Sequence, residues 1–159
     1  MLGFMPAVFH IAIVPGERLL PLGPALILAA PLLLIGLLIA LKVYFTFGLD
    51  RFIYMYMYYP DEGTMKTDQL SQWIRHPQYS SFTFLTLGLV TAAGSLEAVY
   101  ASLFIAAFGL GRVIPEEIEL GERFGESYKS YRRKVPAVLP YPKDWWPFLK
   151  YLLTPGIDK

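Results

Sequence analysis

Two long apolar runs separated by only two residues constrain this chain most strongly. The first run comprises residues 77–93 and the second comprises residues 96–113, with Gly94-Ser95 between them. A helix that crosses a bilayer needs about 20 apolar residues, and the proline that opens the first run fits the first turn of a helix. The two runs therefore predict a helical hairpin, whose ends at His76 and Arg112 lie on the same side of a membrane.

The composition places the chain among integral membrane proteins. Of its 159 residues, 55% are hydrophobic and only 17% are charged, whereas soluble domains carry about 25% charged residues. The length predicts one domain. The absence of cysteine excludes disulfides, thiolate metal sites and a cysteine nucleophile. A net charge of +1 gives no bias toward nucleic acid, so we predict no nucleic-acid partner.

Further apolar segments precede the hairpin. Residues 25–47 form the clearest membrane helix, in which Pro31 is expected to cause a bend and Lys42 to reach the headgroups. Residues 1–14 are apolar but short, and either cross the membrane or lie in its interface. We therefore predict an all-α, multi-pass integral membrane protein with about three to four transmembrane helices.

The segments on either side of the hairpin are more polar. Most Lys and Arg residues lie in residues 48–78 and in the C-terminal tail, which predicts that both face the cytoplasm. The Tyr- and Met-rich residues 52–59 are typical of an interfacial aromatic belt, or of the wall of a lipid groove.

The C-terminal tail combines an amphipathic helix with a proline-rich end. Leu120, Phe124 and Tyr128 recur at helical spacing, which predicts an amphipathic cytoplasmic helix. The basic cluster Arg132-Arg133-Lys134 suits an anionic leaflet. Four prolines are then expected to end regular structure: Pro136, Pro140, Pro142 and Pro147. The aromatic cluster Trp145-Trp146-Pro147-Phe148 is expected to anchor the tail at the membrane interface.

The hairpin also gathers ionisable residues at one membrane face. It brings Arg75 and His76 near Arg112, Glu116 and Glu117. Ionisable groups at membrane depth usually mark a functional site, although a helix-start histidine also serves as a cap and paired acids also favour a first helical turn. Arg112 and Glu116 share a helix face if the helix continues through Pro115. Spacing alone predicts a polar site at the cytoplasmic end of the hairpin, with no metal, since only two histidines exist.

Residues 63–140 resemble the membrane methyltransferase superfamily that includes isoprenylcysteine carboxyl methyltransferases and phospholipid N-methyltransferases. Three blocks match in order and spacing over about half of the chain, which is more specific than any one block. These blocks are Arg75-His76-Pro77-Gln78-Tyr79, then Glu116-Glu117-Ile118-Glu119-Leu120, and then Phe124-Gly125 with Tyr128, Tyr131, Val135-Pro136 and Leu139-Pro140.

The resemblance implies methyl transfer from S-adenosylmethionine, with S-adenosylhomocysteine as product, at the cytoplasmic membrane face. It implies that Glu116 binds the cofactor and that Arg112 contacts the substrate. The other implied cofactor-binding residues are Gly63, Thr64, Met65 and Lys66 in a loop, and Arg75, His76, Pro77, Gln78 and Tyr79. The single domain, residues 1–159, then comprises N-terminal membrane helices (1–47), a cytoplasmic cofactor loop (48–78), the hairpin (79–113) and a cytoplasmic C-terminal segment (114–159).

The methyl acceptor implied by the resemblance is a lipid or a prenylated small molecule. Arg112 favours a carboxylate of the isoprenylcysteine type, which needs no base. An amine acceptor, as in phospholipid N-methyltransferases, would need Glu117 as a general base. Two alternatives are an NADPH-dependent reductase of the steroid 5α-reductase type, which Gln78 argues against, and a non-enzymatic membrane protein.

Three positions depart from the pattern of the superfamily. Ser71 stands where an aromatic residue is usual, so one wall of the cofactor pocket is expected to be rebuilt. Ser80-Ser81 replaces a glycine-containing pair, and Pro115 directly precedes the acid pair, where it could reposition Arg112.

Overall fold

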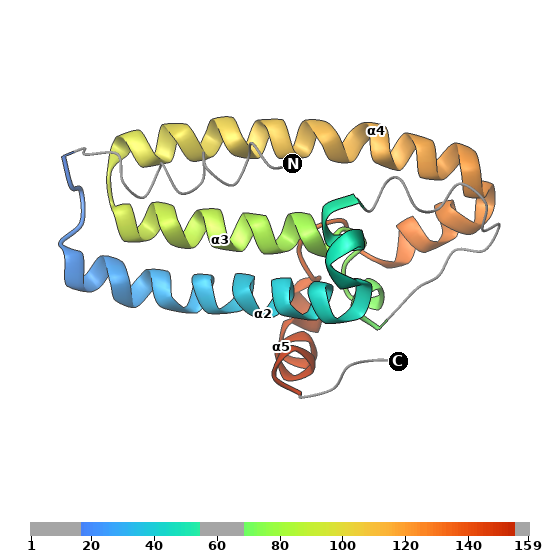
Figure 1. The fold of residues 1–159 in the computed structure, drawn as a ribbon, viewed down its shortest axis with the longest axis horizontal. Helices are drawn as coiled ribbons and strands as arrows, with labels where there is room; N and C mark the ends of the chain where they lie inside the picture. The colour runs from blue at the N-terminus through green and yellow to red at the C-terminus, as the bar shows by residue number, and fades with distance from the viewer. Residues whose placement is uncertain (1–16, 55–68, 155–159) are drawn as a thin grey trace. The chain divides into compact units, whose positions relative to one another are not determined.

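The computed structural model describes residues 17–54 and 69–154 of the chain. These residues are mostly helical and contain no strand, apart from an isolated bridge between Arg18 and Ser95. The elements are α2 (Leu22–Tyr54), η1 (Leu70–Gln72), α3 (Pro77–Ala93), α4 (Leu96–Lys134), η2 (Pro142–Asp144) and α5 (Trp145–Leu153) (Figure 1). Residues 1–14 and the predicted loop Gly63–Lys66 lie outside the described residues, as does most of the aromatic stretch 52–59.

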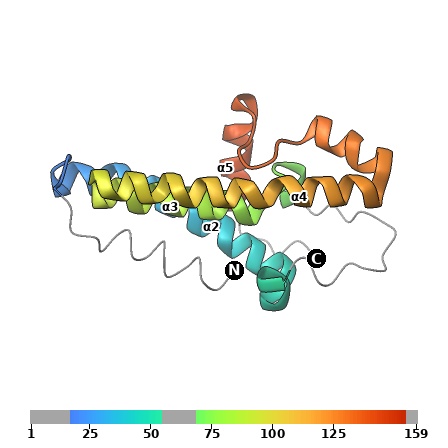
Figure 2. The same ribbon diagram turned by 90° about the horizontal axis from the view of Figure 1, so that it is seen from above.

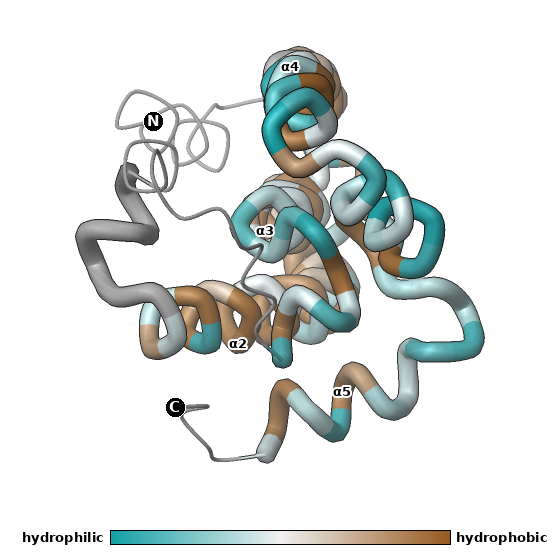
Figure 3. The backbone as a smooth tube through the Cα atoms, turned by 90° about the vertical axis from the view of Figure 1, so that its right-hand side faces the viewer, coloured by the Kyte–Doolittle hydropathy of each residue, from teal (hydrophilic) through white to brown (hydrophobic). Residues whose placement is uncertain are grey.

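Two of the described helices are long and apolar enough to cross a membrane. One is the part of α2 at Leu22–Thr46, with 25 residues, and the other is α4, Leu96–Lys134, with 39 residues. In Figure 3 the tube is brown, meaning apolar, along much of α2. The all-α class is therefore confirmed for the described residues. The length and composition of these two helices agree with a membrane protein.

The helix ends at the predicted turn are confirmed, whereas α4 extends beyond residue 113, where the second apolar run ends. Helix α3 begins at Pro77 and ends at Ala93, and α4 begins at Leu96. Gly94 has a φ of 59°, a left-handed conformation that favours glycine and commonly ends helices. The Ser95 hydroxyl accepts a hydrogen bond from the Ala98 amide at 3.2 Å, which caps the start of α4.

The described chain divides into two compact units, and α2, α3 and α4 each contribute to both. The first unit comprises Met1–Leu37 and Ser81–Gly111. Within it, glycines allow α2 and α3 to pack closely: a Cβ at Gly36 would lie 2.9 Å from the Leu85 backbone nitrogen, and one at Gly88 would lie 2.6 Å from the Leu33 side chain. Small residues allow the same close approach between membrane helices in general.

Arg18 ties the chain before α2 to the turn between α3 and α4. Its Nη2 donates to the Ala92 carbonyl at 2.9 Å, and its Nε donates to the Leu20 carbonyl at 3.3 Å. The Leu19 amide donates to the Gly94 carbonyl at 2.6 Å. These contacts satisfy carbonyls at the end of α3 that have no partner within the helix.

Substituting Gly36 with alanine is expected to destabilise the chain by about 1–3 kcal/mol, because the added methyl group overpacks the contact with α3. Gly23→Ala, in the same helix, is the matched control, since a Cβ there meets nothing within 4 Å. Denaturant unfolding in detergent compares the two variants. Equal stabilities would show that the α2–α3 contact is not tight.

The second unit comprises Leu38–Ser80 and Arg112–Lys159. Within it α4 does not stop at Pro115 but continues to Lys134, and its only non-helical backbone is at Gly125. Figure 1 and Figure 2 both show the end of α4, in orange, turning back at this bend.

The C-terminal tail forms a helix that the prolines did not suggest. The expectation that Pro147 ends regular structure is wrong, because Pro147 lies in the first turn of α5, where a missing N–H is tolerated. Phe148 and Leu152 are buried, and the Phe148 ring lies 6.2 Å from that of Trp73. Lys42 donates to the Thr154 carbonyl at 3.1 Å, which ties the end of α5 to α2.

Candidate active site

The residues just before α3 are positioned by the chain that follows α4. The Arg75 amide donates to the Pro136 carbonyl and the His76 amide donates to the Ala137 carbonyl, both at 2.9 Å. The Ser80 hydroxyl lies within hydrogen-bonding distance of the carbonyl oxygens of His76 and Val138. This pairing fixes the backbone of Arg75 and His76, so that both side chains project from a rigid frame.

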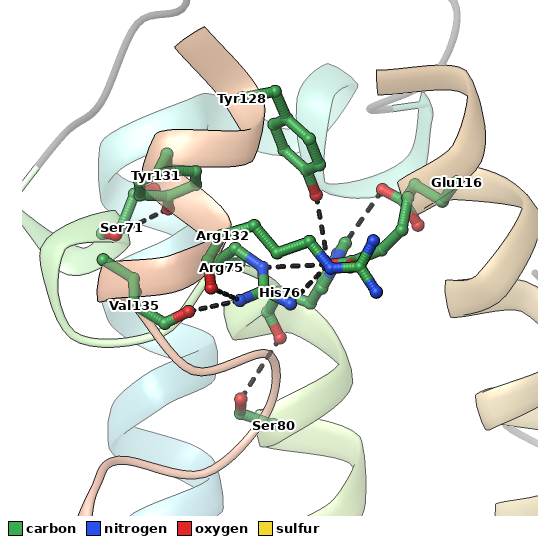
Figure 4. A network of polar contacts seen from close by, with 10 residues as sticks. Ser71, Arg75, His76, Ser80, Glu116, Tyr128, Tyr131, Arg132 and Val135 are labelled. Atoms are coloured by element: carbon green, nitrogen blue, oxygen red, sulfur yellow. Dashed lines mark hydrogen bonds and ion pairs between the residues drawn. The ribbon is translucent and has the colours of Figure 1, made fainter. Parts of the chain in front are cut away.

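Glu117 lies at the centre of a polar network, and Figure 4 shows its labelled partners Arg75, His76, Tyr128 and Arg132. Its Oε1 accepts from Arg75 Nε at 2.8 Å, Arg75 Nη2 at 2.7 Å, His76 Nε2 at 2.9 Å and the Tyr128 hydroxyl at 3.1 Å. Its Oε2 pairs with Arg132 Nε at 2.9 Å. The Glu117 side chain is 7% exposed, and both of its oxygens are occupied.

Arg75 is equally saturated. Besides Glu117, its Nη1 donates to the carbonyls of Arg132 and Val135, and the side chain is 8% exposed. Every nitrogen of the guanidinium group therefore has a partner within the protein. These contacts favour Arg75 as a residue that holds the site together over the direct cofactor contact that we predicted.

Glu117 and Tyr128 lie beyond the apolar run 96–113 of α4. Their environment keeps the Glu117 carboxyl group ionised and the Tyr128 hydroxyl group protonated. Burial alone would raise the pKa of Glu117, but hydrogen bonds from His76 and Arg75 outweigh it and lower the pKa below its usual value. Burial, followed by the charge of Glu117, raises the pKa of Tyr128. A carboxylate with a lowered pKa and occupied oxygens is a weak base, so the geometry favours a positioning role for Glu117.

Glu116 differs sharply from its neighbour. Its side chain is also buried, but Oε1 lies 3.7 Å from His76 Nδ1, which is longer than a hydrogen bond. Its Oε2 is buried and has no hydrogen-bond partner among the described residues. A buried carboxylate oxygen without a donor is costly, and a positively charged ligand would remove that cost.

Arg112 lies one helical turn before Glu116 and is exposed. Because α4 continues through Pro115, the two residues share a helix face as expected. Both lie near the Tyr79 hydroxyl, and the Tyr79 ring lies 5.8 Å from the His76 ring, edge to face. The exposed guanidinium of Arg112 therefore borders the buried carboxylate of Glu116.

Most of the predicted site residues meet in the second unit. Arg75, His76, Tyr79, Arg112, Glu116 and Glu117 form the described site, and Pro77 and Gln78 are buried at the start of α3 beside them. Gly63, Thr64, Met65 and Lys66 are outside the described residues, so their cofactor role stays a prediction.

Three contacts of the site were not predicted from the sequence: two side chains that bond to Glu117, and an aromatic side chain that contacts Ser71. Tyr128 was predicted as part of an amphipathic face and of a block shared with the superfamily, and Arg132 as a lipid contact, but neither was predicted to bond to Glu117, as both do. The Tyr131 hydroxyl donates to the Ser71 carbonyl at 2.6 Å. An aromatic residue from α4 therefore contacts the position where the superfamily usually has its own aromatic side chain.

Comparison with known proteins confirms the resemblance over about half of the chain. The chain is similar to the protein-S-isoprenylcysteine O-methyltransferase of Schizosaccharomyces pombe, with 36% identity over 75 residues, which are 46% of this chain and 32% of the relative. Against the human protein of the same name the identity is 33% over 84 residues, which are 52% and 30% of the two chains. A methanethiol S-methyltransferase from Crocosphaera subtropica is 30% identical over 99 residues, which are 60% and 37%.

The matched region is thus about a third of the length of these relatives. No family model matches the chain, and no solved structure matches it significantly. The relatives nevertheless share one class of reaction, because their names describe methyl transfer to oxygen or to sulfur.

Proposed function

We propose that the chain is an integral membrane methyltransferase. It moves a methyl group from S-adenosylmethionine to a lipid-like acceptor, more readily a carboxylate of the isoprenylcysteine type than an amine. The buried Oε2 of Glu116, which has no partner among the described residues, is the observation that carries this proposal, and the methyltransferase relatives support it. The same relatives do not favour an NADPH-dependent reductase.

The residues around Glu116 fit the proposed cofactor. S-adenosylmethionine supplies a methyl group on a positively charged sulfonium and also carries an ammonium group. Glu116 offers a buried carboxylate to a cation, and His76 and Tyr79 lie beside it. Glu117 holds His76 in place and is itself held by Arg75, so the position of His76 beside Glu116 is pre-organised.

Arg112 is proposed to orient the acceptor. A guanidinium group binds a carboxylate through two parallel hydrogen bonds, and Arg112 is exposed beside Glu116. A carboxylate is ionised at neutral pH and needs no base, whereas an amine or a thiol must lose a proton. Because both oxygens of Glu117 are occupied, a carboxylate acceptor suits the described site better.

The proposed arrangement places the site at the cytoplasmic end of about three to four membrane helices, with residues 114–159 in the cytoplasm or at the interface. The exposed Trp146 and Leu153 on α5 suit an interfacial position. The basic residues Arg133 and Lys134, which end α4, suit an anionic leaflet.

Arg112→Ala is expected to lower methyl transfer roughly tenfold to a hundredfold, because it removes charge-assisted hydrogen bonds to the acceptor. The affinity for S-adenosylhomocysteine should persist, since Glu116 remains. The assay uses methyl-labelled S-adenosylmethionine with N-acetyl-S-farnesylcysteine, a prenylated cysteine with a free carboxylate. Arg123→Ala, at an exposed position on α4, is the control. Unchanged turnover in Arg112→Ala would contradict the assignment of Arg112 to the acceptor.

A further inference from the structure

We infer that Gly125 is a positioning residue for this site, an inference that rests on the proposed function. Its backbone conformation turns the end of α4 back, so that residues 126–135, the return segment, deliver Tyr128 and Arg132 to Glu117. Without that turn Glu117 would lack two of the four residues whose side chains donate to it.

The conformation of Gly125 is one that only glycine adopts readily. Its φ is 55° and its ψ is −131°, a region that mirrors the ordinary extended conformation and that clashes for residues with a Cβ. Space around the residue is not the reason for glycine, because a Cβ there would meet no atom of the described residues within 4 Å. The backbone angle itself is the requirement.

Distances show that the turn is necessary. Tyr128 follows Glu117 by eleven residues and Arg132 follows it by fifteen. In a straight helix these separations correspond to about 16 Å and 22 Å along the axis, which is beyond the reach of the side chains. Yet the Tyr128 hydroxyl lies 3.1 Å from Glu117 Oε1, and Arg132 Nε lies 2.9 Å from Glu117 Oε2.

The return segment also contacts Arg75, which lies just before α3. The carbonyls of Arg132 and Val135 accept hydrogen bonds from Arg75 Nη1, as Figure 4 shows. The chain continues directly into the Pro136 and Ala137 carbonyls, which receive the amides of Arg75 and His76. One backbone turn therefore sets both the side-chain and the main-chain partners of the Arg75-His76 pair.

Alanine variants of Gly125 and Gly121, both on α4, distinguish the effect of losing the turn from the general effect of replacing a helical glycine. Gly121 lies one turn earlier, has an ordinary φ, and would also accept a Cβ without contact. Gly125→Ala is expected to weaken S-adenosylhomocysteine binding about tenfold or more, the usual effect of losing hydrogen bonds to a charged group. It should also speed hydrogen exchange at the amides of Arg75 and His76. Gly121→Ala should change neither quantity.

A double-mutant comparison tests whether the turn at Gly125 is what brings Arg132 to Glu117. Arg132→Gln should weaken S-adenosylhomocysteine binding in the Gly121→Ala background but add nothing in the Gly125→Ala background, because the contact is already lost there. All variants are full-length chains in detergent, and size-exclusion chromatography checks that they are folded. Additive effects of Gly125→Ala and Arg132→Gln would overturn the inference.

The outcomes separate this inference from the proposed function. If the unmodified chain binds S-adenosylhomocysteine and Gly125→Ala keeps both affinity and amide protection, the inference fails and the proposed function stands. If the unmodified chain does not bind, the proposed function fails, and the positioning role that rests on it fails as well. If Gly125→Ala does not fold, the Tyr128→Phe and Arg132→Gln double variant keeps the turn, and binding equal to that of the unmodified chain would refute the positioning role.

Discussion

Glu116→Gln is expected to lower the affinity for S-adenosylhomocysteine by at least about a hundredfold while leaving the chain folded. Breaking a buried ion pair by removing one partner costs about 3–5 kcal/mol, which exceeds a hundredfold in affinity. The fold should survive because Glu116 Oε2 has no protein donor among the described residues. Calorimetric titration of the full chain in detergent measures the effect.

Glu119→Gln is the matched control for this prediction. It makes the same chemical change three residues later on α4, at an exposed position. Its affinity should equal that of the unmodified chain. If Glu116→Gln also bound normally, the unpartnered carboxylate would have another explanation, and the proposal would lose its main support.

Glu117→Ala is expected to destabilise the folded chain by about 3–5 kcal/mol, because it leaves a buried guanidinium without its counter-charge. The Arg75 side chain is 8% exposed and pairs with Glu117 through two nitrogens, so water cannot replace the lost carboxylate. Glu122→Ala, at an exposed position on the same helix, should have little effect. Denaturant unfolding in detergent measures both, and equal stabilities would show that the network does not hold the site.

The pH dependence of stability provides a second test of Glu117. Folding lowers its pKa below the usual value of 4.5, so its ionisation stabilises the folded chain above that value. This stabilisation is lost as the pH falls through the lower, folded pKa. The difference in stability between the unmodified chain and Glu117→Gln should therefore be constant near neutral pH and shrink below about pH 4.5. A difference that did not change with pH would contradict the assignment.

The two adjacent glutamates illustrate how neighbouring groups of one type acquire different roles. Glu117 accepts hydrogen bonds on both oxygens, and the network that it forms holds Arg75 and His76. Glu116 has one oxygen without a protein partner among the described residues. Environment rather than residue type therefore favours a structural role for Glu117 and supports the cofactor contact that we propose for Glu116.

The sequence predicted those parts of the fold that depend on local signals. The start of α3 at Pro77 and the break at Gly94-Ser95 follow from the preferences of proline and glycine. The convergence of Arg75, His76, Arg112 and the acid pair followed from helix lengths and the short turn. Whether α4 continued through Pro115 was open, because a proline within a helix is costly but tolerated when packing supports it.

The remaining features depend on backbone angles and tertiary contacts that periodicity does not encode. The turn at Gly125 requires one unusual φ, ψ pair, so the pairing of Arg132 with Glu117 was not predictable from helical spacing. Helix α5 contains Pro147, and its formation is supported by burial of Phe148 and Leu152. Tertiary packing thus overrode the local signal that a proline gives.

The most direct test of the proposed activity is a labelled-methyl assay on the purified full chain in detergent. Methyl-labelled S-adenosylmethionine and N-acetyl-S-farnesylcysteine are incubated with the unmodified chain and with Glu116→Gln, and the product is identified by mass spectrometry. We predict a labelled methyl ester from the unmodified chain and almost none from Glu116→Gln. Failure of the unmodified chain to bind S-adenosylhomocysteine, or saturable binding of NADPH in its place, would contradict the account.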